Sequence, residues 1–457
     1  MTAPLDTSTD RQAAALAKTQ LGNAQRLALR HRGEVHYCPE EPAWYVWDGR
    51  RFQQDKDNVL VERRAHAVVA AIADEARTFD DFEYQRMHMR HHEKSQSHGQ
   101  ITGMVKRARV LPEVTVAGHE FDRDPWLLNV LNGTVDIRTG ELQEHRREDL
   151  LTKLTPVVFD PDAVCPRWLT FLDETLDSPE LVDYLQQVVG YSLTGDVSDQ
   201  SIFVFAGDGN NGKSTLLNTM LFLAGDEYGL QAPSDLLVAR RRDSHPTAFA
   251  DMQGRRLVVA SELNERAQLD EALVKSLSGG ETLSARRMRA DYQRISPTWK
   301  LFLSVNHLPV ITGRDEGIWR RLRYIPFTRQ ISGDQRDPHL GARLQEEMSG
   351  ILNWALEGAG RWLSHGELTP PDEVTYAVRR ARYQQDPILG FLEVACDQGP
   401  TYECRARDLY AAYEQWHKAH GTQPQLTKKA FGLELARHGF SSVKRSDAYW
   451  AGLRLRR

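Results

Sequence analysis

Cysteine and long apolar runs are scarce in this chain of 457 residues. The four cysteines, Cys38, Cys165, Cys396 and Cys404, lack the paired close spacing of a zinc site, so we interpret them as reduced packing residues. No apolar run approaches the roughly 18 residues that span a bilayer, and residues 1–10 lack the apolar core of a secretory signal. We therefore expect a cytoplasmic protein with no membrane partner.

A strong charge of one sign is also absent. The formal net charge is −5, which alone gives no reason to expect nucleic acid, but the distribution of charge matters more than its sum. Residues 428–457 contain eight lysines and arginines against two carboxylates, so this end of the chain is a candidate phosphate-binding surface. His88, His91, His92 and His98 lie in a polar stretch without cysteine, and we interpret them as a solvated surface rather than a metal site.

What the sequence does contain is a phosphate-binding loop. An apolar run from Ile202 to Phe205 is followed by a glycine-rich segment and then by a helical pattern that includes Leu217 and Leu221. The segment fits G-x-x-x-x-G-K-[ST], in which backbone N–H groups surround phosphates, the lysine reaches the β and γ oxygens and the hydroxyl ligates Mg²⁺. The predicted nucleotide-binding residues are Gly207, Asp208, Gly209, Asn210, Asn211, Gly212, Lys213, Ser214 and Thr215. ATP and Mg²⁺ are the expected cofactors.

Two further apolar runs end in polar residues suited to hydrolysis. Residues 257–261 have the length of a buried parallel strand, and Glu262 follows at the carboxyl end, where ligands bind in open α/β sheets. We predict that Glu262 holds Mg²⁺ or activates the attacking water, with Ser214 as a second metal ligand and Glu265 as an assistant; a helix-capping glutamate is the alternative. Residues 300–305 precede Asn306, whose amide would orient water or contact the γ-phosphate, unless it is only a turn residue.

Arg320 and Arg321 stand just before a further predicted strand, residues 322–327. An arginine pair at the edge of a nucleotide domain suits an arginine finger, which stabilises charge on the phosphoryl transition state. We take Arg321 as the first choice and Arg320 as the second. Surface solvation is the plainer interpretation of any single arginine.

Taken in order, these elements resemble a superfamily 3 helicase, specifically the helicase part of the phage and plasmid primase family related to the poxvirus primase-helicase. The resemblance implies that they are Walker A, Walker B, sensor 1 and arginine finger on an AAA+-like domain that forms a hexameric ring and unwinds 3′ to 5′. It extends to the flanks, at residues 125–133 and 386–391. Ser261 departs from the Asp-Glu pair of many AAA+ proteins, so the metal would be held mainly through Ser214 and water. We predict no primer synthesis, because too little chain precedes the helicase for a polymerase-like domain, and a separate primase or polymerase is a possible partner.

The DNA contacts are predicted in two places. Residues 273–289 resemble the family's B-prime region, which leads into a hairpin facing the channel of the ring, and a solvated charged loop is the alternative. The C-terminal region has apolar residues at helical spacing, a second helix start at residue 427 and a final strand, turn and strand, which is a winged-helix pattern; such domains also serve protein contacts. The predicted DNA-binding residues are Lys275, Arg286, Arg287, Arg289, Lys428, Lys429, Lys444 and Arg445.

The expected fold is α/β, an AAA+-like P-loop NTPase core (residues 161–370) between an N-terminal α+β domain (1–160) and a C-terminal winged-helix domain (371–457). The expected function is an ATP-dependent DNA helicase acting on single-stranded or forked DNA during replication of a phage, plasmid or other mobile element in a bacterial host cell. The first alternative is an ATP-switched origin-binding or helicase-loading protein that does not unwind DNA. The second is a small-molecule kinase, which would not need Asn306, the arginine pair or a basic terminal domain.

Overall fold

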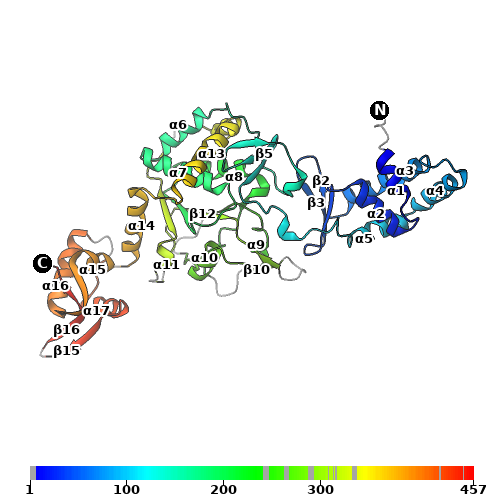
Figure 1. The fold of residues 1–457 in the computed structure, drawn as a ribbon. Helices are drawn as coiled ribbons and strands as arrows, with labels where there is room; N and C mark the ends of the chain where they lie inside the picture. Colours follow the sequence, from blue (N-terminus) through cyan, green and yellow to red (C-terminus); the bar gives the residue numbers. More distant parts are fainter. Residues whose placement is uncertain are drawn as a thin grey trace.

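The chain folds into an extended molecule of three units, with the N-terminal unit at one end and the C-terminal unit at the other (Figure 1). The computed structural model describes residues 7–239, 246–261, 267–286, 293–306, 308–311, 313, 316–331, 337–386, 388–420, 424–445 and 447–456. No helix among these residues is long and apolar enough to cross a membrane.

The N-terminal unit packs five helices beside a small antiparallel sheet of order β1-β2-β3. Its elements are α1 (Thr7–Ala14), α2 (Gln20–Arg30), β1 (Val35–Cys38), β2 (Ala43–Trp47), β3 (Phe52–Asp55), α3 (Val59–Ala76), α4 (Phe82–Ser95) and α5 (His98–Ala108). The mixture of helices and strands agrees with the α+β domain expected here. The core is shared by α2, α3 and α5, where Leu27, Val68 and Met104 are fully buried.

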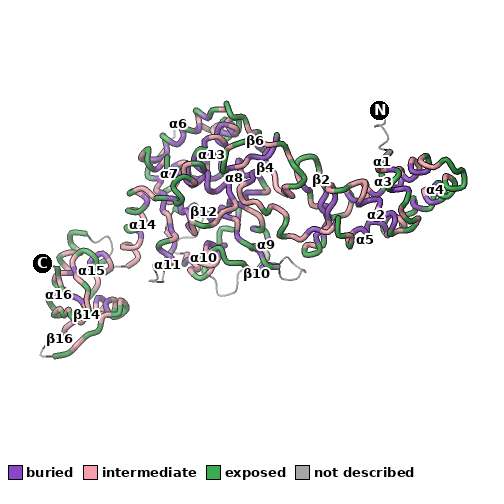
Figure 2. Tube along the Cα trace, in the orientation of Figure 1, coloured by how far each residue is buried: buried purple, intermediate pink, exposed green. Residues whose placement is uncertain are grey.

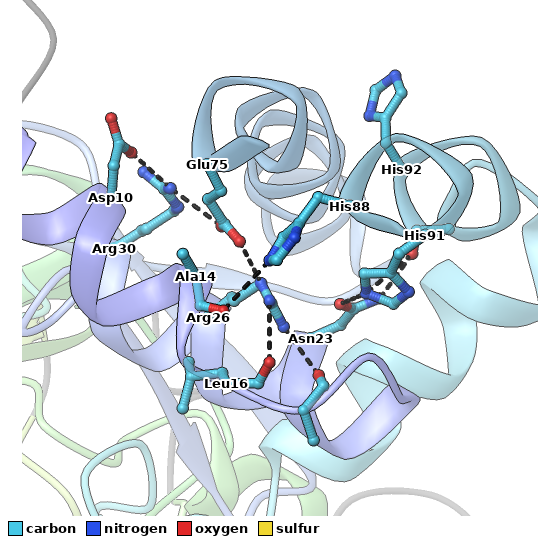
Figure 3. A network of polar contacts seen from close by, with 12 residues as sticks. Asp10, Ala14, Leu16, Asn23, Arg26, Arg30, Glu75, His88, His91 and His92 are labelled. Carbon is cyan, nitrogen blue, oxygen red and sulfur yellow. Dashed lines mark hydrogen bonds and ion pairs between the residues drawn. The ribbon is translucent and has the colours of Figure 1, made fainter. Parts of the chain in front are cut away.

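A buried polar network ties the helices of this unit together (Figure 3). Arg26 and Glu75 form an ion pair with both side chains fully buried, 2.9 Å between Nε and Oε2. His88 is fully buried and His91 is 6% exposed, and His91 Nε2 lies 2.8 Å from Asn23 Oδ1. The expectation of a solvated histidine surface is therefore wrong for these two residues, because distant helices supply polar partners that make their burial tolerable.

The central unit is built on a parallel sheet of order β13-β7-β12-β9-β8. Side chains along each strand point alternately to its two faces. On β7, Phe203 and Phe205 enter one apolar core while Ile202 and Val204 enter a second core on the other face. A sheet buried on both faces requires nearly continuous apolar strands, which is the pattern that these runs have.

Helices cover both faces of this sheet, and α8 and β12 are largely buried (Figure 2). The first core is formed with α6, α7, α8 and α13, and the second with α10 and α11. The elements of the unit are β4 (Leu127–Val130), β5 (Gly133–Asp136), β6 (Glu141–Gln143), α6 (Pro166–Thr175), α7 (Pro179–Ser192), β7 (Ile202–Ala206), α8 (Lys213–Tyr228), β8 (Gly229–Gln231), α9 (Pro246–Ala250), β9 (Leu257–Ser261), α10 (Glu271–Ser278), β10 (Leu283–Ala285), β11 (Gln293–Ile295), β12 (Lys300–Val305), α11 (Glu316–Trp319), β13 (Leu322–Pro326), α12 (Leu340–Glu346) and α13 (Met348–His365). The short 3-10 helices η1 (Gly118–Glu120) and η2 (Arg147–Asp149) contact the N-terminal unit instead.

The packing moves both expected domain boundaries. Leu128 and Val135, on β4 and β5, belong to the same core as the helices that follow residue 160. After residue 371, α14 (Asp372–Gln385) still packs on the central unit, with Val374 in the first core and Ala381 in the second. The boundary expected at residue 160 and the one expected at 370 therefore both fall inside the central unit.

The C-terminal unit has its own small core and an antiparallel sheet of order β14-β16-β15. Its elements are α15 (Leu389–Ala395), β14 (Cys396–Arg405), α16 (Ala406–His420), α17 (Lys428–Arg437), β15 (Ser441–Lys444) and β16 (Ala448–Leu455). Leu409 and Tyr413 of α16 are buried with Phe431 of α17. The side chain of Thr427 caps α17 by accepting from Ala430 N at 3.3 Å, as its position at the helix start predicts.

All four cysteines are free thiols, three of them buried and Cys404 half-buried. Within the described parts of the chain, no group of three or more His, Cys, Asp or Glu side chains could hold a metal ion. The burial of three of the four thiols agrees with the interpretation of the cysteines as packing residues.

Candidate active site

The phosphate loop connects β7 to α8 at the carboxyl edge of the parallel sheet. Its backbone visits the left-handed region three times, with φ of +90° at Gly209, +49° at Asn210 and +86° at Gly212. A Cβ on Gly212 would also lie 2.6 Å from Thr175 Cγ2 and 3.1 Å from the Phe171 ring. Glycine is therefore required at residue 212 by both conformation and space.

Lys213, the first residue of α8, points back into this loop. Its Nζ donates to the carbonyl oxygen of Gly207, to Asn211 Oδ1 at 3.1 Å and to Asn306 Oδ1 at 3.4 Å. Burial lowers the pKa of Lys213, and the carboxylate of Asp208 opposes that shift. The ammonium group is thus partly desolvated and pre-oriented, which strengthens its interaction with an anion that enters the loop.

Asn211 anchors the loop to the neighbouring edge strand. Its Nδ2 donates to the carbonyl oxygen of Phe327, just beyond β13, at 3.1 Å. Gly207 packs against the same group, since a Cβ there would lie 2.3 Å from Phe327 O. Asn211 therefore holds both Lys213 and β13, which makes it a structural member of the loop as well as a candidate ligand contact.

A cavity of about 1210 Å³ opens above the loop. It extends from the loop to one wall formed by α6 and another that includes the start of α12. The sequence pattern did not indicate these walls, because they come from segments outside the loop that only the tertiary fold brings to the site. Lining residues that the sequence did not single out are Arg167, Phe171, Glu174, Asn218, Gln231, Ser304, Gln330, Ile331, Asp337, Pro338 and Leu340.

The carboxyl ends of the neighbouring strands line the same cavity. Because β12 lies between β7 and β9, the structure brings Asn306 and Ser261 beside the loop, as the strand pattern predicts. Ser261 Oγ accepts a hydrogen bond from Gln231 Nε2 at 2.9 Å. Glu262 and Glu265 lie outside the described residues. Ser214 is exposed and lines the cavity, so a hydroxyl oxygen suited to Mg²⁺ faces the space where a phosphate would lie.

The arginine pair lies at the amino ends of the strands, on the opposite side of the sheet from the phosphate loop. Arg320 and Arg321 immediately precede β13, which runs parallel to β7, so the five-residue length of β7, roughly 16 Å of strand, separates them from the phosphate loop of the same chain. Arg321 donates to Gly317 O at 2.6 Å and to Gln200 Oε1 at 3.2 Å. Arg320 is exposed. The two arginines thus have different surroundings, which the sequence alone does not distinguish.

The candidate DNA contacts are distributed over two units. In the central unit, β10 pairs antiparallel with β11, as expected for a hairpin. Arg286, directly after β10, is exposed, whereas Lys275 of α10 is half-buried. Arg287 and Arg289 lie outside the described residues. In the C-terminal unit, all four predicted cations are exposed, two in the first turn of α17 and two at the connection from β15 to β16: Lys428, Lys429, Lys444 and Arg445.

Three stretches of the chain match known families. Residues 24–177 match the family described as D5 N terminal like, and residues 383–449 match the one described as Poxvirus D5 protein-like. Between them, residues 205–321 match a family of unknown function (DUF5906). This middle match begins in β7 and ends at Arg321, so it covers the phosphate loop, Asn306 and the arginine pair.

Similar proteins occur in large DNA viruses. A protein of Acanthamoeba polyphaga mimivirus, provisionally named a helicase, is 25% identical over 330 residues, 66% of this chain and 34% of the relative. A protein of African swine fever virus, provisionally named a primase, is 25% identical over 380 residues, 76% of this chain and 39% of the relative. The chain thus spans only about two fifths or less of the length of these relatives. Among solved structures, the apo C-terminal region of NrS-1 has the same fold with a TM-score of 0.54 and 11% identity, covering 95% of this chain and 99% of that one.

Proposed function

Because the chain belongs to the D5-like primase-helicase family, we propose that it is an ATP-driven DNA helicase for the replication of a phage, plasmid or other mobile element. The observation that carries this proposal is the position of Lys213, whose ammonium group lies between the phosphate loop and Asn306 at the carboxyl edge of the sheet. A lysine held against both a phosphate loop and a neighbouring strand end suits nucleotide hydrolysis better than nucleotide binding alone.

In this proposal, the loop and Lys213 bind the β- and γ-phosphates of ATP. Ser214 and, through water, Glu262 hold Mg²⁺, which supplies charge neutralisation at the phosphates when it is bound. Glu262 accepts a proton from the attacking water, and Asn306 orients that water or contacts the γ-phosphate. Hydroxyl, amide and carboxylate oxygens are donors that Mg²⁺ prefers, so these residue types fit the ion.

A ring of identical copies would complete the site. The arginine pair is at the far edge of its own sheet, so it would stabilise transition-state charge on ATP bound by a neighbouring copy. This separation supports an AAA+-like assembly in which each site is shared between two copies. A hexameric ring and 3′ to 5′ movement are the parts of this proposal that rest on the superfamily 3 resemblance.

DNA would be held by the hairpin of β10 and β11 and by the C-terminal unit. The latter has the order helix, strand, two helices and two strands, closed by a three-stranded antiparallel sheet, which supports assignment as a winged-helix domain. Exposed lysines and arginines at α17 and at the β15–β16 connection supply charge for phosphate contacts, which are independent of base sequence. A separate primase or polymerase would act with the motor, and a bacterial cytoplasm is the proposed site of action.

The proposal is tested by measuring ATP turnover of the full chain with and without single-stranded DNA, together with strand displacement on forked duplexes that carry a 3′ or a 5′ tail. Wild type should turn over ATP faster with DNA and displace strands from the 3′-tailed substrate. Lys213→Ala should abolish both activities. Lys94→Ala, which removes an exposed lysine of α4 in the distant N-terminal unit, should change neither.

Each failure has a distinct meaning. Turnover that persists in Lys213→Ala would refute the site assignment. DNA-stimulated turnover without strand displacement would favour the ATP-switched origin-binding or helicase-loading alternative. Turnover that depends on a small-molecule acceptor and not on DNA would favour the kinase alternative.

A further inference from the structure

The loop between α7 and β7 gathers contacts from several strands at the amino edge of the sheet, opposite the phosphate loop. Arg256, just before β9, donates to Leu193 O at 2.5 Å. Lys300, the first residue of β12, donates to the carbonyl oxygens of Thr194 and, at 3.2 Å, of Asp196. Both cations are buried, and burial lowers the pKa of each. The beginnings of the two strands that end at Ser261 and beside Asn306 are therefore fixed to this one loop.

Gln200 lies near the end of the loop and joins it to the arginine pair. Its φ of +56° is in the left-handed region, which residues other than glycine adopt at a cost of order 1 kcal/mol or more. Its Oε1 accepts from Arg321 Nη2 at 3.2 Å. On the other side, Gly317 O accepts from Arg321 Nη1 at 2.6 Å, and the backbone oxygen of Arg321 accepts from Ile202 N at 2.7 Å. Arg321 is thus held through both its guanidinium group and its backbone.

We propose that Gln200 is a positioning residue. Its side chain holds Arg321 in place, and the fixed Arg321 in turn presents the exposed Arg320 to the nucleotide of a neighbouring copy. This inference rests on the proposed function, in which the arginine pair serves another copy. The side chain of this strained glutamine restrains the guanidinium group of Arg321, and with it the turn that carries Arg320. Restraint of a catalytic group before reaction lowers the entropy lost in the transition state.

Gln200 also connects the arginine pair to the phosphate loop of its own copy. Gln200 leads within two residues into β7, and the far end of β7 is the phosphate loop of its own copy. A displacement of β7 when that loop binds nucleotide would therefore move Gln200 and the arginine pair together. In this way the nucleotide state of one copy would be transmitted to the arginine that serves the next copy.

Two substitutions separate positioning from a merely structural role. Gln200→Glu keeps the length of the side chain and its acceptor oxygen, so it preserves the contact with Arg321. It does not relieve the backbone strain, because asparagine adopts the left-handed conformation more readily than glutamate or glutamine does. Gln200→Asn keeps the amide and suits the backbone, yet it is one methylene too short to reach Arg321. If the residue only stabilised the fold, Gln200→Asn would match or exceed wild type. If it positions the arginines, Gln200→Glu retains DNA-stimulated turnover within about twofold, whereas Gln200→Asn lowers kcat by about 10- to 100-fold with little change in KM.

Lysine substitutions then assign the two arginines. Arg321→Lys keeps donors for the carbonyl groups of Gly317 and Gln200, so it should retain most turnover. Arg320→Lys should lose turnover, because a single ammonium group does not reproduce the planar fork of arginine at a phosphoryl group. Activity should return when Gln200→Asn copies are mixed with Lys213→Ala copies, since an interface then pairs an intact loop with an intact arginine.

The outcomes distinguish this inference from the function on which it rests. Normal kcat in Gln200→Asn, or loss of kcat in Gln200→Glu with an unchanged melting temperature, overturns the positioning role of Gln200. Full activity of Arg320→Lys together with loss in Arg321→Lys overturns the assignment of Arg320. Full activity of a double Arg320→Ala, Arg321→Ala variant would instead refute the proposed shared site, whatever the behaviour of Gln200.

Discussion

Asn306→Asp is expected to weaken nucleotide binding, because the new carboxylate would compete with phosphate for Lys213. The asparagine Oδ1 is 3.4 Å from Lys213 Nζ. Two unit charges at that distance attract by about 5 kcal/mol at an effective dielectric constant near 20 and by about 1 kcal/mol in bulk water. Asn306 is exposed whereas Lys213 is buried, so we place the effect between these limits, at about 2 kcal/mol. That free energy corresponds to roughly 30-fold weaker binding of ATP.

Titration with a fluorescent ATP analogue measures this loss, and steady-state kinetics should place it in KM. Asn306→Ala removes the amide without adding charge, so it should lower kcat and leave affinity nearly unchanged. Asn218→Asp is the matched control, since it adds the same charge to the same cavity from α8, and it should weaken binding by less. Wild-type affinity in Asn306→Asp, or an equal loss in Asn218→Asp, would refute the assigned contact between Asn306 and Lys213.

Three further expectations concern other parts of the chain. Glu262→Gln should bind ATP but hydrolyse it slowly, because an amide keeps the shape and loses the basicity; weakened binding with normal single-turnover hydrolysis would contradict this role. Replacing Arg286, Arg287 and Arg289 by alanine should reduce the slope of log affinity for single-stranded DNA against log salt concentration by about 0.7 per lost phosphate contact. An unchanged slope in titrations at several salt concentrations would mean that these arginines belong to a solvated loop and do not contact DNA. Burial, and then the charge of Arg26, lower the pKa of His91 to about 4, below the 6.5 or so of an unfolded histidine. As the pH falls, the unfolded chain therefore binds this proton before the folded chain does, and the stability of the N-terminal unit should fall from about pH 6.5 towards pH 4. Hydrogen exchange should show a less steep fall in His91→Gln.

Elements buried on both faces were predictable from the sequence. The inner strands β7, β9 and β12 were found where nearly continuous apolar runs stand, and the edge strand β13 was found although Arg323 interrupts its apolar residues. The other edge strand, β8, is only three residues long and has no such run, yet it pairs with β9. Local sequence therefore predicts the inner strands better than it predicts the short edge strand β8.

Long-range packing explains the remaining differences. His88 and His91 look like surface residues in sequence, but their burial depends on groups of α1 and α2 that are more than 60 positions away. The boundary expected at residue 160 does not separate two cores, because β4 and β5 pack on helices that follow it. Likewise, the pattern placed an arginine pair before β13, but only the fold reveals that Arg321 is held by Gln200.

The pairing of β7 has a consequence for the synthesis of this protein. Both neighbours of β7 come much later in the chain, since it pairs with Leu301–Val305 on one side and with Leu322–Pro326 on the other. Contacts of such long sequence separation form slowly and only after the later segment is available. A nascent chain that has not yet left the ribosome beyond Pro326 therefore lacks the sheet that supports the phosphate loop. Truncated products that end between the phosphate loop and Pro326 should fail to bind nucleotide even though they contain every residue of the loop.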